Sequence, residues 1–154
     1  MTEENKQKVM YLKGYARQLN TIICCKRTIE TLLGDIEELR RDVSEAKCQP
    51  ITGLPGTHNK KDLSDYIVKI EESEESIEKL INKINIAKQQ AAEECTKIYT
   101  AVNMMNTNTQ EYKNILIYKH IQRKSWKDIA DFYGYTRGGI YKIYLKALDE
   151  FQIP

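Results

Sequence analysis

The stretch that most constrains the fold spans residues 125–143 and reads SWKDIADFYGYTRGGIYKI. When Trp126 is position 1 of a twenty-residue unit, the small Ala130 falls at position 5 and Gly134 at position 9. Two helices that cross steeply need a small side chain where they meet, and the turn between them needs a residue that tolerates positive φ. The positions that point into the core shared by the two helices all hold isoleucine: Ile129, Ile140 and Ile143. This spacing predicts a helix-turn-helix.

Capping residues set the starts of the two helices in this stretch. Ser125 and Asp128 stand three residues apart, the spacing of a capping box, so a helix is expected to begin at Trp126. Thr136 can cap the helix that follows the turn. The apolar residues that recur here with helical spacing are expected in the core: Trp126, Phe132, Tyr133, Tyr144, Leu148 and Phe151.

A further helix is expected ahead of this stretch. Residues 106–109 read NTNT, and such residues favour turns and helix caps over helix interiors. A helix capped by Asn108 or Thr109 should therefore start there and end near residues 122–124. His120 is expected to be a helix-end residue only.

The outward face of the second helix of the motif predicts binding to double-stranded DNA, because a helix-turn-helix places that helix in the major groove. Arg137 is the expected base or phosphate reader, and backbone N–H groups at the capped helix start can hold a phosphate. The glycines at 138 and 139 cost helix stability and read no base, but they let the backbone approach DNA closely. The predicted DNA-binding residues are Arg137, Tyr141, Lys142, Lys146, Lys124, Lys127, Thr136 and Gly138.

The net charge of +2 divides unevenly along the chain. Residues 107–154 hold eight Lys or Arg and five Asp or Glu, an excess of +3, whereas residues 1–106 carry −1. Phosphate is therefore attracted to the C-terminal third. The acidic run over residues 71–78 is interpreted as a solvated helix face.

Two long helices are predicted ahead of the motif. From about residue 3 to 47, apolar or small residues recur in steps of 3 and 4, with one slip between Ile22 and Cys25. Residues 48–59 contain the only cluster of Pro and Gly and must form a loop. A second helix, from about residue 60 to 105, has a regular seam that starts with Leu63, Tyr66, Ile70, Ser73, Ile77, Leu80, Ile84, Ala87 and Ala91.

The predicted fold class is all-α. Two helices of similar length most simply fold back as an antiparallel hairpin, or coiled coil, over residues 1–105, and a three-helix helix-turn-helix domain follows over residues 106–154. The hairpin is interpreted either as a spacer or dimer handle, or as an element with a direct functional role. A homo-oligomer is expected.

Enzymes, membrane proteins and metalloproteins are disfavoured. The chain has no run of eighteen uncharged apolar residues, no basic and apolar leader, no glycine-rich phosphate loop and no carboxylate cluster around a histidine. Its four cysteines, Cys24, Cys25, Cys48 and Cys95, lack metal-site spacing and are interpreted as small buried residues or free thiols. We therefore expect no catalytic residue, no cofactor, no metal and no membrane contact, and a cytoplasmic location.

Several segments also carry a family resemblance. Residues 122–130 (QRKSWKDIA), 133–136 (YGYT), 140–144 (IYKIY) and 147–148 (AL) resemble region 4 of bacterial sigma factors as it appears in small phage regulators of the ArpU and RinA type. The segments GLPG at 53–56 and DLSDYI at 62–67 resemble a group of phage proteins of Gram-positive bacteria with the same sigma-like tail.

This resemblance implies a phage or prophage regulator that binds promoters in a bacterial host cell and acts on transcription of late genes, with host RNA polymerase as a candidate partner. The sequence departs from the family pattern at residues 138–139, where side chains that can contact bases are usual. Two alternatives stay open: a protein of phage DNA packaging similar to a terminase small subunit, and a helical interaction protein that does not bind DNA.

Overall fold

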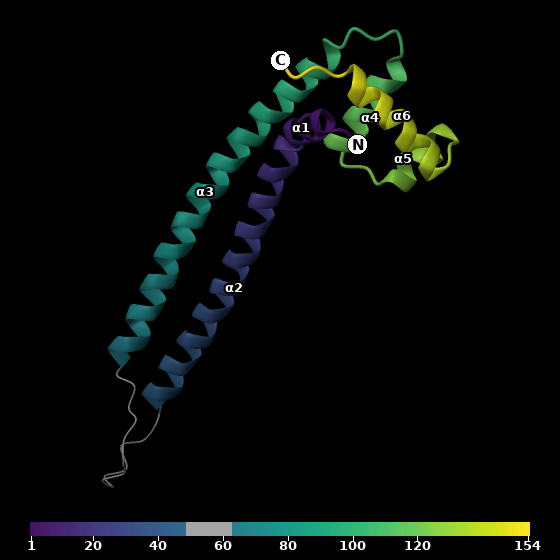
Figure 1. Cartoon of the computed structure of the whole chain (residues 1–154). Helices are drawn as coiled ribbons and strands as arrows, with labels where there is room; N and C mark the ends of the chain where they lie inside the picture. The colour runs from purple at the N-terminus through teal and green to yellow at the C-terminus, as the bar shows by residue number, and fades with distance from the viewer. Residues whose placement is uncertain (49–62) are drawn as a thin grey trace. The chain divides into compact units, whose positions relative to one another are not determined.

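A computed structural model describes residues 1–48 and 63–154, and the regular structure in these ranges is entirely helical (Figure 1). None of the helices found there is long and apolar enough to cross a membrane. The chain packs as two compact units. The terminal unit contains Met1–Thr21 and Ile86–Pro154, and the central unit contains Ile22–Asn85. The helices are α1 (Glu3–Leu12), α2 (Gly14–Cys48), α3 (Leu63–Asn103), α4 (Gln110–His120), α5 (Trp126–Tyr133) and α6 (Arg137–Glu150).

The single helix predicted from about residue 3 to 47 is wrong, because it is divided into α1 and α2 at Lys13. The sequence signal for this break is Gly14, a weak helix former next to it. The physical reason is the tertiary packing of α1, whose Leu12 is fully buried in the core of the terminal unit. The slip between Ile22 and Cys25 does not interrupt α2.

In the central unit, α2 and α3 run side by side in opposite directions (Figure 1). Arg40 on α2 forms an ion pair with Glu74 on α3, with 3.1 Å between Nη2 and Oε1. Ile22, Cys25 and Ile84 are buried on the predicted seams. The presence of two long helices is thus confirmed, although the first begins at Gly14 and not near residue 3. The predicted loop over 48–59 and the predicted helix start at 60 lie mainly outside the described residues.

The terminal unit has one continuous hydrophobic core. Helices α4, α5 and α6 pack against one another, and α1 packs against α6. This core joins residues from both sides of the predicted domain boundary at 105 and 106, so the packing divides the chain elsewhere. Its largest fully buried side chains are Phe151, Leu12, Ile98, Ile115, Leu116, Ile129, Ile140, Leu148 and Val102.

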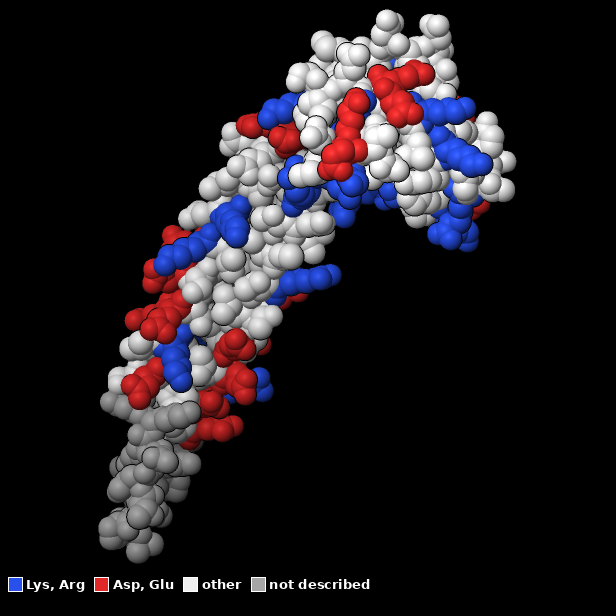
Figure 2. All heavy atoms as spheres, in the orientation of Figure 1, with Lys and Arg blue, Asp and Glu red and all other residues white. Residues whose placement is uncertain are grey.

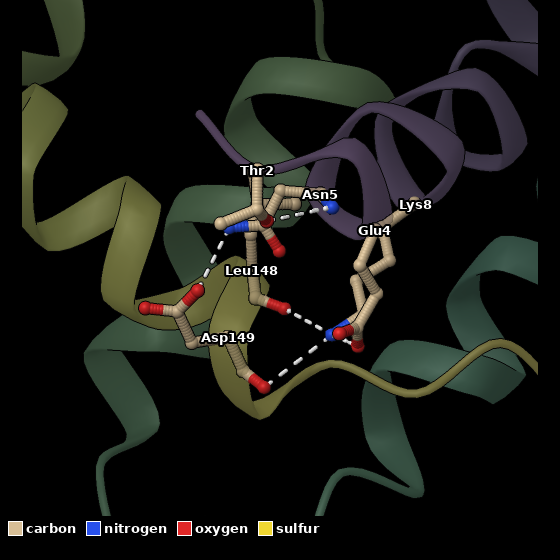
Figure 3. A network of polar contacts seen from close by, with 6 residues as sticks. All are labelled: Thr2, Glu4, Asn5, Lys8, Leu148 and Asp149. Carbon is tan, nitrogen blue, oxygen red and sulfur yellow. Dashed lines mark hydrogen bonds and ion pairs between the residues drawn. The ribbon is translucent and has the colours of Figure 1, made fainter.

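A polar network attaches α1 to the C-terminal end of α6 (Figure 3). The buried ammonium of Lys8 donates to the carbonyl oxygens of Leu148 at 3.0 Å and Asp149 at 3.4 Å, and it pairs with the Glu4 carboxylate at 2.7 Å. The Asn5 amide donates to Asp149 Oδ1 at 2.7 Å. The last carbonyls of a helix lack partners within that helix, and the local dipole favours a cation there. Helix α1 therefore supplies the cation that the last turn of α6 lacks.

Candidate nucleic-acid interface

The start of α5 has the predicted capping box. Ser125 Oγ accepts a hydrogen bond from the Asp128 backbone N–H at 3.1 Å, and Asp128 Oδ2 accepts one from the Ser125 backbone N–H at 3.2 Å. Hydrogen bonds from the Ser125 side chain and backbone are the main causes that lower the pKa of the Asp128 carboxyl. The local sequence thus fixes where α5 begins.

The turn between α5 and α6 also follows the prediction. Gly134 ends α5 with φ 70°, the left-handed conformation that a residue without a Cβ adopts freely. Thr136 then caps α6, since its Oγ1 accepts a hydrogen bond from the Gly139 N–H at 3.1 Å. Ile129, Ala130 and Ile140 are buried beneath the turn, and Ile143 is half-buried.

The exposed face of α6 is basic. Gly138, Lys142 and Lys146 follow one another at intervals of four residues, so they form one row along the helix, and all three are exposed. The opposite face is buried and contains Ile140 and Tyr144. Figure 2 shows blue side chains on the part of the terminal unit that carries α5 and α6.

The cations of this face have no acidic partner in the part of the chain that the structure describes. Arg137 lies at the first position of α6 and is exposed, as are Lys142 and Lys146 further along. None of the three forms an ion pair with a residue in the described ranges 1–48 and 63–154. Their charges are therefore available to an external anion.

The two glycines of the first turn of α6 differ in their surroundings. A Cβ placed on Gly138 would meet no atom within 4 Å, whereas one placed on Gly139 would lie 3.2 Å from Thr136 Oγ1. Gly139 thus leaves room for the helix cap. Gly138 has no such packing reason within the described residues and leaves the backbone of α6 open to approach.

Two of the predicted DNA-binding residues are partly engaged in packing. Tyr141 is 40% exposed and meets the ring of Trp126 edge to face, with 5.6 Å between ring centroids. Lys124 is half-buried, and its ammonium lies 4.6 Å from the centroid of the Tyr118 ring and 5.7 Å from that of Phe132. Lys127, at the start of α5, is exposed as a phosphate contact would require.

The prediction that Phe132 lies in the core is wrong. Its side chain is 64% exposed on α5, and its ring packs edge to face against Tyr118 and Tyr133 at 5.6 and 5.1 Å between centroids. The other predicted core residues are less exposed. Tyr144, Leu148 and Phe151 are buried, and Trp126 and Tyr133 are half-buried. Helical spacing places Phe132 among the apolar residues of α5. The apolar face of this short helix is, however, wider than the surface that α4 and α6 cover.

His120 has a role beyond ending α4. It is buried, and its Nε2 lies 3.0 Å from the hydroxyl of Tyr144 on α6. Burial is the main cause that lowers the pKa of His120 to about 4, and the positive charges of Lys119 and Lys13 lower it further. Burial raises the pKa of the Tyr144 hydroxyl, which therefore keeps its proton. A polar histidine at a helix end gives no sequence signal of such a buried contact.

We expect the terminal unit to lose stability as the pH falls from about 6.5 towards 4. The unfolded chain takes up a proton on His120 below about pH 6.5, whereas the folded chain does not until about pH 4. At about 1.4 kcal/mol per pH unit, this difference amounts to about 2–3 kcal/mol between pH 7 and pH 4.5. Urea unfolding followed by Trp126 fluorescence at the two pH values measures it.

The His120→Gln variant is the control, because glutamine cannot titrate while the carboxylates that protonate near pH 4 are common to both proteins. The variant should show a flatter dependence on pH. Equal slopes in the two proteins would contradict the assignment of this dependence to His120.

Comparison of the chain with models of protein families, with curated proteins and with solved structures finds no match.

Proposed function

We propose that α5 and α6 form a helix-turn-helix that binds double-stranded DNA, and that the protein is a transcription regulator of phage or prophage type. The observation that carries this proposal is the outward face of α6. It presents Arg137, Lys142 and Lys146 to solvent without an acidic partner among the described residues, while the opposite face is packed against α4 and α5. A helix with a cationic outer face and an inner face that packs on the rest of its domain is suited to insertion into a DNA groove.

The dimensions of α6 suit the major groove. Its 14 residues make a helix about 21 Å long at 1.5 Å per residue, and a major groove about 12 Å wide admits such a helix. The Arg137 guanidinium at the N-terminal end can form paired hydrogen bonds with a guanine or a phosphate. Lys142 and Lys146 continue the cationic row along the helix and supply contacts to the phosphate backbone.

The step from DNA binding to transcription control rests on the resemblance of residues 122–148 to sigma region 4 in small phage regulators. That resemblance supports promoters as the DNA target and host RNA polymerase as a second partner. Lys127 at the start of α5 adds a phosphate contact outside the recognition helix. No catalytic step is part of the proposal.

The Gly138→Ala variant should change the stability of α6 and its affinity for DNA in opposite directions. An alanine there has space and suits a helix better than glycine, so the unfolding free energy should rise by about 0.5–1 kcal/mol. The affinity for duplex DNA should nevertheless fall several-fold, because a Cβ at this position holds the phosphate backbone away from the helix start. Thermal unfolding and fluorescence anisotropy measure the two effects.

The Gly34→Ala variant is a matched control. A Cβ on Gly34, within α2, would likewise meet no atom within 4 Å. This variant should gain stability with unchanged DNA affinity. If Gly138→Ala also leaves the affinity unchanged, the backbone at residue 138 does not approach DNA.

Fluorescence anisotropy with a duplex of random sequence, measured over a series of salt concentrations, tests the proposal. Binding through the cationic row should weaken as salt rises, with a slope of about −3 or steeper in log affinity against log salt concentration for three or more phosphate contacts. A helical interaction protein would show no binding to the duplex at low salt. That result, or binding that does not change with salt, would overturn the proposal.

A further inference from the structure

Besides the cations on α6, the terminal unit has a second group of cations where α2 begins and α4 ends. Lys13, between α1 and α2, and Arg17, one helical turn later, are both exposed. Lys119 lies half-buried in the last turn of α4, and Arg123 is exposed in the loop that follows this helix. Lys13, Arg17, Lys119 and Arg123 are here called the junction cluster. Figure 2 shows blue side chains in the region where α2 begins.

Packing within the terminal unit brings the two segments of the junction cluster together. The Arg123 guanidinium donates a hydrogen bond to the side-chain oxygen of Asn20 at 3.3 Å, across 103 positions of sequence. Asn20 lies three residues after Arg17, on the same face of α2. Burial lowers the pKa of Lys119, and the positive charge of Lys13 lowers it further, so these two ammonium groups are also near each other. The start of α2 therefore lies beside the end of α4.

The positive charge of the junction cluster has no counterion in the described ranges 1–48 and 63–154, since none of its four residues forms an ion pair there. The hydrogen bonds that Arg17, Lys119 and Arg123 donate go to uncharged carbonyl or amide oxygens. Glu94 on α3 lies against the start of α2, but its carboxylate pairs with Lys97 at 3.2 Å. Like charges that repel one another in the folded chain favour the binding of an anion that neutralises them.

Arg123 adopts a backbone conformation that favours glycine. Its φ is 56°, and among the described residues it is the only one other than glycine with a positive φ. A side chain in this left-handed region is strained, and a residue that follows a helix in this conformation is usually glycine. The exposed hydrogen bond to Asn20 offsets little of this cost. The arginine is therefore better explained by a contact that its side chain makes outside the chain.

Trp126 connects the junction cluster to the outer face of α6. The Lys119 ammonium lies 4.4 Å from the centroid of the Trp126 ring, and the same ring meets Tyr141 edge to face at 5.6 Å between centroids. Tyr141 is exposed and lies one helical turn after Arg137. A duplex carries one phosphate charge per about 1.7 Å of its axis, so its backbone continues past α6 with charges at close intervals.

We propose that the junction cluster binds the phosphate backbone of the same duplex that α6 contacts, beside the segment held in the groove. The start of α2 then forms part of the DNA interface. This inference rests on the proposed function and extends its contact surface. Lys13 and Arg17 belong to residues 1–106, whose net charge is −1, so only the fold brings them next to the basic C-terminal third.

The chemistry of the cluster favours a phosphate backbone over a protein partner. Protein interfaces have an apolar core, whereas contacts to phosphate come from arginine, lysine and small polar side chains. The exposed side chains that meet here are of the second kind: Lys13, Arg17, Asn20 and Arg123. Their spread over two segments suits successive phosphates of one strand.

Fluorescence anisotropy with a random-sequence duplex of about 20 base pairs, or two helical turns, tests the proposal over a series of salt concentrations. The Lys13→Ala/Arg17→Ala variant should bind about tenfold more weakly near about 0.1 M salt, and its slope in log affinity against log salt concentration should be less negative by about 2. Its melting temperature should be unchanged or higher, because the repulsion between Lys13 and Lys119 is removed.

The control variant Lys69→Ala/Lys83→Ala removes the same net charge from exposed positions of α3 in the central unit. Its affinity should stay within about threefold of the parent, because distant charges are screened by salt. An equal loss in the control and in Lys13→Ala/Arg17→Ala would overturn the proposal, since net charge alone would then explain the effect.

The Arg123→Gly variant tests the loop separately. Glycine suits the left-handed conformation, so the melting temperature should rise. The affinity for the duplex should nevertheless fall several-fold, because a cation of the interface is lost. An Arg123→Gly variant that gains stability and binds DNA as tightly as the parent would remove Arg123 from the interface.

The outcomes separate this inference from the proposed function. If the parent binds the duplex and Lys13→Ala/Arg17→Ala binds it with the same affinity and the same salt slope, the inference is overturned and the proposed function stands. If the parent does not bind the duplex at low salt, both are overturned.

Discussion

Replacing both Arg137 and Lys142 by alanine should lower the affinity for duplex DNA by about 100-fold or more. Each hydrogen bond to a charged group contributes about 1.5–3 kcal/mol, and each 1.4 kcal/mol changes the dissociation constant about tenfold. Both side chains are exposed, and neither forms an ion pair within the described part of the chain. Circular dichroism should therefore show unchanged helix content while fluorescence anisotropy shows the loss of affinity.

The matched control for this variant removes two exposed lysines of α3 in the central unit. Lys69→Ala/Lys83→Ala gives the same change in net charge at two other exposed positions. We expect its affinity to stay within about threefold of the parent, because long-range charge effects are screened at physiological salt. An equal loss in both variants would mean that net charge, and not α6, determines binding.

Replacing Phe151 by alanine should lower the unfolding free energy of the terminal unit by about 3–5 kcal/mol, the usual cost of removing a buried phenylalanine side chain. Phe151 is fully buried directly after α6, and its ring lies 6.1 Å from that of Tyr11 on α1. Its backbone N–H bonds to the carbonyl oxygens of Ala147 and Leu148. The side chain thus fixes the end of α6 against α1.

The chain provides its own control, because its only other phenylalanine is Phe132. That side chain is 64% exposed, so Phe132→Ala removes little beyond its ring contacts with Tyr118 and Tyr133 and should lower the unfolding free energy by only about 1 kcal/mol. Urea unfolding followed by the fluorescence of Trp126 measures both variants, since this single tryptophan lies in the terminal unit. Similar losses in both variants would contradict the core described for this unit.

The features that sequence predicted well are local ones. The capping box at Ser125 and Asp128, the left-handed Gly134 and the cap at Thr136 each depend on residues a few positions apart. Their steric and hydrogen-bonding requirements are therefore visible in the sequence itself. The buried Ile129 and Ile140 followed from the same short-range spacing.

The features that sequence missed depend on contacts between distant segments. Lys8 and Asn5 look like ordinary helix-surface residues, and only the packing of α1 on α6 gives them partners 140 or more positions away. The apolar periodicity continues across Lys13, so it could not reveal that the helix is divided there into α1 and α2. His120 is likewise explained only by Tyr144 across the core.

For the candidate site, the sequence pointed to the helix but not to which of its side chains are paired or packed. The basic excess and the motif spacing pointed to α6. Only the structure distinguishes Arg137 and Lys142, which form no ion pair among the described residues, from Lys124, whose ammonium lies against aromatic rings. The open space beside Gly138 is likewise visible only in the structure, because the sequence gives no reason to distinguish Gly138 from Gly139.

A titration of the ¹⁵N-labelled protein with a short DNA duplex, monitored by the backbone amide signals, tests whether α6 contacts DNA. We expect the largest chemical-shift changes on the first half of α6, at the amides of Arg137, Gly138, Tyr141 and Lys142, and we expect these changes to diminish as salt is added. Changes concentrated on α2 or α3 of the central unit, or no changes at low salt, would contradict this expectation.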